Sequence, residues 1–242
     1  MAAVVQEEFF KATAGHRACF AGGCATIFIA IARSILFIKT PQDLLRSTLA
    51  ALLGYLAADL VSGIYHWSVD NYGTAETPFL GFQIELFRVH HKQPWAVTKY
   101  DTARAVHIVA AAVAVLLLPP ALAARDPAAL GFLAAFGGFV MFSLQIHAWA
   151  HTAKKNIPAG VRALQDAGII LRPSWHAAHH RPPFNNTYCS VSGWCDPVLD
   201  KLKVFETMEV VLFHVAGVRP QCWSENKLRR DSGDSTIDEV EE

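Results

Sequence analysis

Eight of the eleven histidines in this chain fall into four short clusters. They are His66, with Asp70 after it, the pair His90 and His91, the pair His147 and His151, and the group His176, His179 and His180. Residues four apart in a helix share one face, so the imidazoles of His147 and His151 can point at a common ion. Imidazole binds zinc, iron, copper or nickel, so the spacing predicts a metal site without naming the metal.

The number of candidate ligands favours two metal ions over one. A structural zinc ion is closed by four ligands, and a catalytic one uses three plus a water molecule. Eight histidines together with Asp70 exceed that need, so we predict a dinuclear site with open coordination positions. A zinc-dependent membrane hydrolase, which needs only about three ligands, is the less favoured alternative.

Two acidic residues near the clusters are predicted to support liganding imidazoles by hydrogen bonding. Asp59 precedes the first cluster by two helical turns and lies on about the same face. An acid within an apolar helix is costly unless it finds a partner, either a liganding imidazole or a polar neighbour such as Ser62 or Gln145. Glu85 precedes the second cluster and is assigned the same supporting role, with direct ligation of the metal as its alternative.

The clusters must be positioned by apolar helices. The chain is 52% hydrophobic and only 17% charged, with a mean hydropathy of +0.26, whereas a soluble domain carries about 25% charged residues. Four stretches, 19–38, 44–65, 105–124 and 127–146, have roughly the 20 apolar residues that a membrane-spanning helix needs. We therefore predict an all-α integral membrane protein, a four-helix bundle in which short loops join the helices into two hairpins.

Four crossings place both ends of the chain and all four histidine clusters on one side of the membrane. That side carries many basic residues between Lys11 and Arg162, whereas the other side has little beyond Lys39, Arg46 and Arg125. By the positive-inside rule, the side with the clusters is cytosolic, or stromal in a plastid. A metal transporter would place its ionisable residues near the middle of the membrane, which this arrangement does not favour.

The remaining features bound the domain organisation. We predict an N-terminal segment over 1–18, one membrane domain over 19–223, and a disordered acidic tail over 224–242. The start of the chain contains Glu7 and Glu8 and does not resemble a transit peptide. The five cysteines fit no disulfide framework, and the net charge of zero gives no indication of a nucleic-acid partner.

The motifs around the clusters resemble those of plant plastid fatty acid desaturases, which place a trans Δ3 double bond in the palmitoyl chain of phosphatidylglycerol. The similarity covers roughly residues 45 to 223. Its most specific part is the run from His176 to Arg181, with Asn185 and Asn186 after it. Plasmanylethanolamine desaturases, which form the vinyl ether of plasmalogens, are similar more loosely. They have an additional histidine where this chain has Trp175, which favours the plastid branch.

The resemblance implies an oxygen-dependent lipid desaturase with a di-iron centre. The ligands carried over by position are His66, His90, His91, His147, His151, His176, His179 and His180, with Asp70 as a further member. The expected partners are a membrane glycerolipid and a separate electron donor of the ferredoxin or cytochrome b5 type, since no nucleotide-binding fingerprint is present. The expected location is a chloroplast membrane, as a multi-pass protein, with the endoplasmic reticulum as the alternative.

The chemistry explains why such a centre needs oxygen. A methylene group of an acyl chain has no acidity that a general base could use, so only a strong oxidant can remove its hydrogen. Two reduced irons supplied with O2 and electrons can provide one, because they keep open coordination positions. A di-metal lipid hydroxylase starts with the same hydrogen abstraction and remains an alternative, as does a vinyl ether-forming desaturase.

Overall fold

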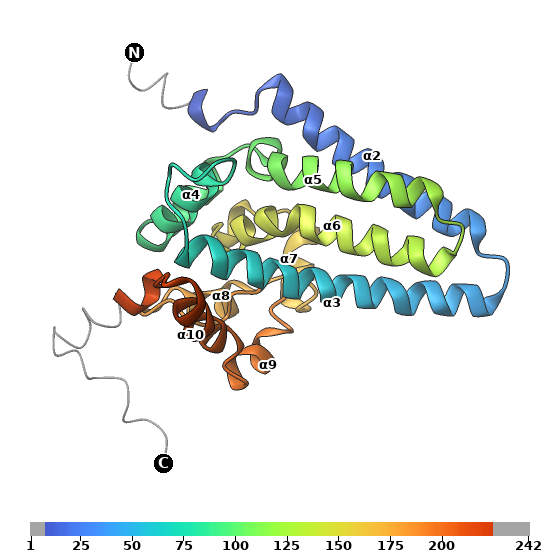
Figure 1. The fold of residues 1–242 in the computed structure, drawn as a ribbon. Coiled ribbons are helices and arrows are strands. Elements are labelled where there is room, and N and C mark those ends of the chain that lie inside the picture. Colours follow the sequence, from blue (N-terminus) through green and yellow to red (C-terminus); the bar gives the residue numbers. More distant parts are fainter. Residues whose placement is uncertain (1–7, 225–242) are drawn as a thin grey trace.

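The computed structural model describes residues 8–224, and this part of the chain contains helices and no strand. Its body consists of four long helices, α2 (Ala14–Phe37), α3 (Pro41–Asn71), α5 (Thr102–Ala123) and α6 (Pro127–Ala150), which lie side by side (Figure 1). The shorter helices are α4 (Gly81–Lys92), α7 (Ala159–Asp166), α8 (Pro173–His179), α9 (Asp196–Lys201) and α10 (Val204–Ala216). Two 3₁₀ turns, η1 (Pro94–Lys99) and η2 (Lys154–Asn156), complete the order.

Local sequence explains where the hairpins turn. At the start of α3 the Thr40 hydroxyl accepts a hydrogen bond from the backbone N–H of Asp43 at 3.1 Å, and the Asp43 carboxylate accepts one from that of Thr40 at 3.0 Å. At the start of α6 the Asp126 carboxylate accepts from the backbone N–H of Ala129 at 3.2 Å. Proline occupies the first turn of both helices, where its missing N–H costs nothing. The connections 38–40 and 124–126 are therefore tight, as the sequence predicted.

The helices pack mainly as α3 against α6 and α2 against α5. Small residues permit the close approach of α3 and α6. A Cβ atom on Gly54 would lie only 2.6 Å from the carbonyl oxygen of Phe132, and one on Gly131 would lie 2.6 Å from the hydroxyl of Ser47. Such contacts between small residues replace the hydrophobic driving force that is missing between helices in lipid.

All four long helices are long and apolar enough to cross a membrane. Large apolar side chains on their outer faces are exposed by half or more, including Leu52, Leu53, Val115 and Leu116. An exposed apolar surface of this extent is unfavourable in water and is suited to contact with lipid. The prediction of an all-helical protein with four helices able to span a membrane is thus confirmed for the described residues. Helices α3 and α6 continue past the apolar runs that end at 65 and 146 and into the first and third histidine clusters.

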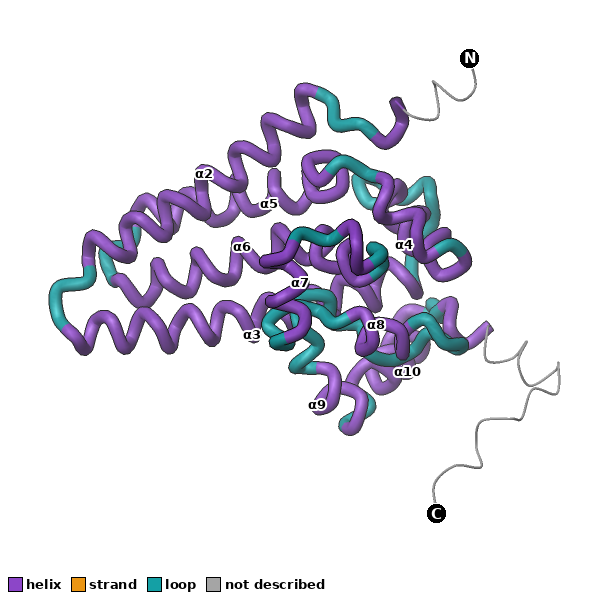
Figure 2. The backbone as a smooth tube through the Cα atoms, turned by 180° about the vertical axis from the view of Figure 1, so that it is seen from behind, coloured by secondary structure: helices purple, strands orange, loops and turns teal. Residues whose placement is uncertain are grey.

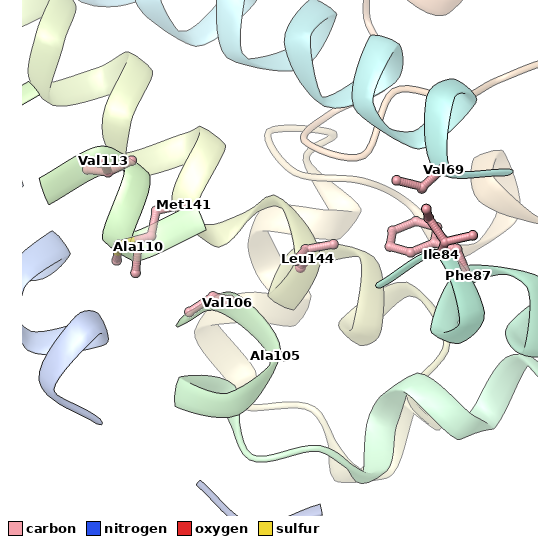
Figure 3. Close-up of a cluster of buried hydrophobic side chains, with 9 residues drawn as sticks. All are labelled: Val69, Ile84, Phe87, Ala105, Val106, Ala110, Val113, Met141 and Leu144. Atoms are coloured by element: carbon pink, nitrogen blue, oxygen red, sulfur yellow. The ribbon is translucent and has the colours of Figure 1, made fainter. Parts of the chain in front are cut away.

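Three of the short helices gather at one end of the bundle. The views in Figures 1 and 2 agree that α4, α8 and α10 lie where α3 and α6 end and α2 and α5 begin. Figure 3 shows that Ile84 and Phe87 of α4 face Val69 of α3, which fixes α4 against the bundle. The predicted tail, 224–242, lies outside the described part of the chain except for Ser224, and so do the first seven residues.

Candidate metal centre

The first cluster lies on the last two turns of α3. The helix continues through these polar residues and ends at Asn71, so His66 and Asp70 stay four residues apart on one helical face. Both side chains are buried. The apolar run ends at 65, and the helix continues through the ligand candidates, as their spacing of four residues predicted.

The second cluster is held by α4. Gly81 begins this helix so close to the turn before it that a Cβ there would lie 1.9 Å from the carbonyl oxygen of Ala75. Ile84 and Phe87 then bury one face of α4, which brings His90 into the interior and leaves His91 partly buried beside it.

The third and fourth clusters come from the ends of two further helices. His147 lies in the last turn of α6, and His151 is the residue that ends it. His176 and His179 lie on α8, and His180 ends that helix. All four clusters therefore meet at the same end of the bundle.

The candidate ligands form two groups. Group 1 consists of His90, His147, His151, His176 and His180, and group 2 of His66, Asp70, His91 and His179. Within each group the potential ligand atoms all lie within 4.8 Å of one another. His90 and His91, adjacent in sequence, face different groups, as do His179 and His180.

The nitrogen atoms of group 1 point at a common centre. Nε2 of His151 lies 3.2 Å from Nε2 of His147 and 3.2 Å from Nε2 of His180, which in turn lies 3.1 Å from Nε2 of His176. An ion bound at about 2.0–2.1 Å by imidazole nitrogens separates adjacent ligand atoms by about 2.9–3.4 Å for angles between 90° and 109°. The spacing in group 1 therefore fits a first-row metal ion.

Group 2 is arranged around one carboxylate oxygen. Oδ2 of Asp70 lies 3.3 Å from Nε2 of His66, 3.4 Å from Nε2 of His91 and 3.2 Å from Nε2 of His179. The two nitrogens of His91 and His179 are 3.0 Å apart. Neither oxygen of Asp70 has a hydrogen-bond donor, although both are buried.

Hydrogen bonds on the far side of the rings fix which nitrogen carries the proton. Nδ1–H of His66 donates to the carbonyl oxygen of Tyr188 at 2.9 Å, and that of His179 donates to the carbonyl oxygen of Asn186 at 2.8 Å. In a neutral imidazole Nε2 then carries only a lone pair. The lone pairs of His66 and His179 face the carboxylate of Asp70, which also has only lone pairs when ionised, so these two contacts are repulsive unless a metal ion or a proton lies between the atoms.

The electrostatics of group 1 favour neutral rings. Burial, and then the neighbouring imidazoles, lower the pKa of His90, His176 and His180, and lower the pKa of His151 to about 4. Neutral imidazole is the form that binds a metal ion, because the ligand nitrogen must be free of its proton. The donor set of five imidazoles in one group, and three with a carboxylate in the other, suits iron as well as zinc.

The supporting role predicted for Asp59 is not what the structure shows. Asp59 is fully buried, but its Oδ1 accepts the backbone N–H groups of Ser192 and Gly193 at 2.7 and 3.0 Å, and its Oδ2 accepts that of Cys195 at 3.0 Å. The three charge-assisted hydrogen bonds compensate its burial. Asp59 thus contacts a loop and no imidazole, and it supports the site only through that loop.

Glu85 also departs from its predicted role. It is exposed on α4, on the face opposite the buried Ile84 and Phe87, and lies in neither group. The solitary His16 and His107 pack against each other, with ring centroids 4.2 Å apart, away from both groups.

Sequence reasoning missed the loop that holds two of the rings. Tyr188 and Asn186 provide the carbonyl acceptors for His66 and His179, and the hydroxyl of Ser190 lies 3.2 Å from Nδ1 of His66. Backbone carbonyls leave no residue-type signal, so only their position after the last cluster could have indicated them.

The sequence was compared with those of known protein families and proteins. Residues 55–223 match the lipid desaturase domain. Fatty acid desaturase 4, chloroplastic, from Arabidopsis thaliana is 46% identical over 210 residues, which cover 87% of this chain and 65% of that protein. Its relative fatty acid desaturase 4-like 2, chloroplastic, is 42% identical over 89% of this chain and 77% of its own length.

A further relative lies outside plants. Plasmanylethanolamine desaturase from Myxococcus xanthus is 36% identical over 71% of this chain and 62% of its own length. No solved structure matches the chain. The matched domain covers both groups of candidate ligands and most of the described helices, and the chain belongs to the lipid desaturase family.

Proposed function

We propose that the protein is a membrane-bound, oxygen-dependent di-iron desaturase that introduces a double bond into the acyl chain of a glycerolipid, with phosphatidylglycerol palmitate as substrate. The observation that carries the proposal is the pair of buried ligand groups at one end of four membrane-length helices. In this proposal group 1 holds one iron, and group 2, with its carboxylate, holds the other.

The reaction balances only with an external supply of electrons. A saturated carbon–carbon bond, O2, two electrons and two protons give a double bond and two molecules of water. The irons would supply the oxidant that removes hydrogen from an unactivated methylene. No nucleotide-binding fingerprint is found in the sequence, so the electrons come from a separate protein of the ferredoxin or cytochrome b5 type.

The residues of this chain have three tasks. The Nδ1–H bonds of His66 and His179 keep Nε2 directed inward, and the same holds for His90, whose Nδ1–H donates to the carbonyl oxygen of Phe87. Phe87 and Tyr188 pack against ligand rings and keep water away from them. The bundle binds the acyl chain.

An apolar groove is available for that chain. A cavity of about 590 Å³ runs along α6 between α2 and α3. Its lining includes Ile31 of α2 and, along α6, Gly138, Ile146 and Trp149. Its last residues on α6 neighbour His147 in sequence. The groove supports the entry of an acyl chain from the membrane toward the end of the bundle that carries the ligand groups.

The names of the relatives and the charge distribution support a location in a chloroplast membrane. Several relatives are named chloroplastic, and the basic residues predict that the ligand end faces the stroma. We accordingly propose a multi-pass protein of a chloroplast membrane, with 19–223 as its catalytic domain. An endoplasmic reticulum protein with a cytosolic site remains the alternative.

The alternative function is formation of a vinyl ether, as the name of the Myxococcus xanthus relative suggests. At the position that favoured the plastid branch, the indole N–H of Trp175 donates to Oδ2 of Asp196 at 3.1 Å. The same carboxylate accepts the backbone N–H of Cys189 through Oδ1 at 2.9 Å. Trp175 thus fixes α8 to the loop that follows it, next to His176.

The test combines metal analysis with lipid profiling. Membranes of a host that contains both phosphatidylglycerol and alkyl-ether phosphatidylethanolamine should gain a desaturated palmitoyl chain when the protein is expressed. His147→Ala should lose both iron and product, because it removes a ligand from the centre of group 1. His214→Ala, at an exposed position on α10, is the matched control and should keep both. Vinyl ether in place of desaturated palmitate would reject the proposed substrate, and full product from His147→Ala would reject the metal site.

A further inference from the structure

A small polar pocket opens beside group 2. It has a volume of about 180 Å³, and Asp70 and His91 of group 2 line it together with Arg88 and Lys92. Pockets that enclose a whole small molecule usually measure about 300–1,000 Å³. This one is of a size for part of a larger ligand, and it lies at the end of the bundle where a lipid headgroup would be.

The charge of the pocket is positive apart from the carboxylate of group 2. Arg88 and Lys92 are four residues apart on α4, and His91 is three residues after Arg88. Side chains three and four apart on a helix are neighbours, so both cations lie on the face that carries this ligand candidate. Asp70 is the only acidic residue among those that line the pocket, and its oxygens face the imidazoles of group 2.

Arg88 is held in place but keeps unused donors. Its Nη2–H donates to the carbonyl oxygen of Gly73 at 2.8 Å, which anchors one edge of the guanidinium. Its Nε is buried and has no hydrogen-bond acceptor. The hydrogen bond to Gly73 fixes the orientation of the guanidinium, and the unpaired donor can bind an anion through a directed hydrogen bond.

The other walls of the pocket are fixed as well. The ring of Phe184 stacks on His91 with centroids 4.6 Å apart. On the other side the backbone N–H of Cys222 donates to Oδ1 of Asn71 at 3.1 Å, and the indole N–H of Trp223 donates to the buried carboxylate of Glu209 at 2.9 Å. These contacts hold the segment around residue 222 against α3, so the pocket exists before any ligand binds.

We propose that this pocket binds the phosphodiester of the glycerolipid substrate, with Arg88 and Lys92 as its cationic ligands. The proposal rests on the lipid desaturation proposed above and assigns the residues that recognise the phosphate of the substrate's headgroup. An acidic electron-donor protein is disfavoured as the occupant, because the two cations are confined to one helical turn within a concavity. A protein partner would need charges spread over a wider face.

The test compares a lipid that has the phosphodiester with one that lacks it. Full-length, iron-loaded protein is placed in bilayer discs with equal amounts of dipalmitoyl phosphatidylglycerol and dipalmitoylglycerol. Desaturation of each lipid and retention of each lipid by the protein, read by native mass spectrometry, are measured. Arg88→Gln keeps an N–H for the carbonyl of Gly73 and removes the charge, and Lys92→Gln changes an exposed side chain.

We expect each variant to lower the preference for phosphatidylglycerol by about tenfold in both readouts, the effect of one lost charge-assisted hydrogen bond. Arg88→Lys should restore part of it, and Lys155→Gln, an exposed basic residue elsewhere, should change nothing. If the wild type is active and the variants keep its preference for phosphatidylglycerol, the assignment of the pocket to the phosphodiester is wrong. The proposed desaturation is unaffected by that outcome. If the variants desaturate both lipids more slowly by the same factor, and a higher concentration of electron donor restores the rate, the pocket is a docking surface for the donor and the phosphodiester assignment is wrong. If the wild type desaturates neither lipid, the proposed function fails and the retention measurement still decides the pocket.

Discussion

At the scale of single residues, the position of one proton on each ring decides what the site can do. A carbonyl oxygen behind His66 and another behind His179 hold the proton on Nδ1, so that Nε2 faces Asp70 without one. The acceptors are backbone atoms of the segment 186–190, and Asp59 anchors the continuation of that segment through Ser192, Gly193 and Cys195. A carboxylate two turns below the site thereby contributes to the orientation of a ring that it does not touch.

Asp70→Asn tests whether group 2 is a separate metal site. The asparagine keeps the shape but removes the only anionic ligand of that group, so the bound iron should fall from about two ions per chain to about one, with loss of desaturation. Iron and protein are measured on the same purified sample. Asp166→Asn, which affects only an exposed ion pair with Lys154, is the control. Two irons retained by Asp70→Asn would contradict the assignment of Asp70.

At the scale of helices, the groove along α6 offers a direct test of where the acyl chain lies. Gly138 lines the groove, and the nearest atom to a Cβ placed there is 3.8 Å away, on Ile27. A side chain at this position would therefore project into free space without disturbing the helix contacts, in contrast to Gly54 and Gly131, where neighbouring atoms leave no room.

Gly138→Leu should reduce desaturation of palmitoyl lipids at least about fivefold while iron content stays unchanged, because the added side chain overfills the space that the acyl chain needs. Gly160→Leu is the matched control, since a Cβ there meets nothing within 4 Å. Desaturation of dipalmitoyl phosphatidylglycerol and of dipalmitoylglycerol is measured in parallel with the iron content of the protein. Wild-type turnover by Gly138→Leu would show that the chain lies elsewhere.

The helices also show what sequence patterns can and cannot predict. The apolar runs predicted four spans, and the spacing of four predicted that His147 and His151 point the same way, because both signals are local. The division of His90 and His91 between two groups was not predictable, since it depends on how Ile84 and Phe87 seat α4 against α3. The misassignment of Glu85 has the same origin.

Asp59 illustrates a second limit of sequence reasoning. Its burial was predictable from its apolar surroundings, but its partners lie more than 130 residues further along the chain and are backbone amides. Only the folded loop defines that contact.

At the scale of the whole molecule, both ends of the described chain lie at the end of the bundle that carries the ligand groups (Figures 1 and 2). Four membrane-length helices in two hairpins account for this, because an even number of crossings returns the chain to its starting side. The two termini should then share a compartment with the site.

Tags placed at Met1 and Glu242 should accordingly report the same side of the membrane. Protease protection of sealed vesicles gives the answer, with a tag in the loop 124–126 as the control for the opposite side. Protection of one terminus and cleavage of the other would show that one of the four helices does not cross.

The candidate ligands of both groups are completed only near the end of the described chain. Group 1 extends from His90 to His180 and group 2 from His66 to His179, so neither group is complete until the last cluster has left the ribosome. By then all four apolar helices, which end at Ala150, have already been synthesised. If the two groups bind metal as proposed, neither has its full set of ligands at the point where the last apolar helix is complete. A chain that stops short of His179 would lack a ligand of both groups.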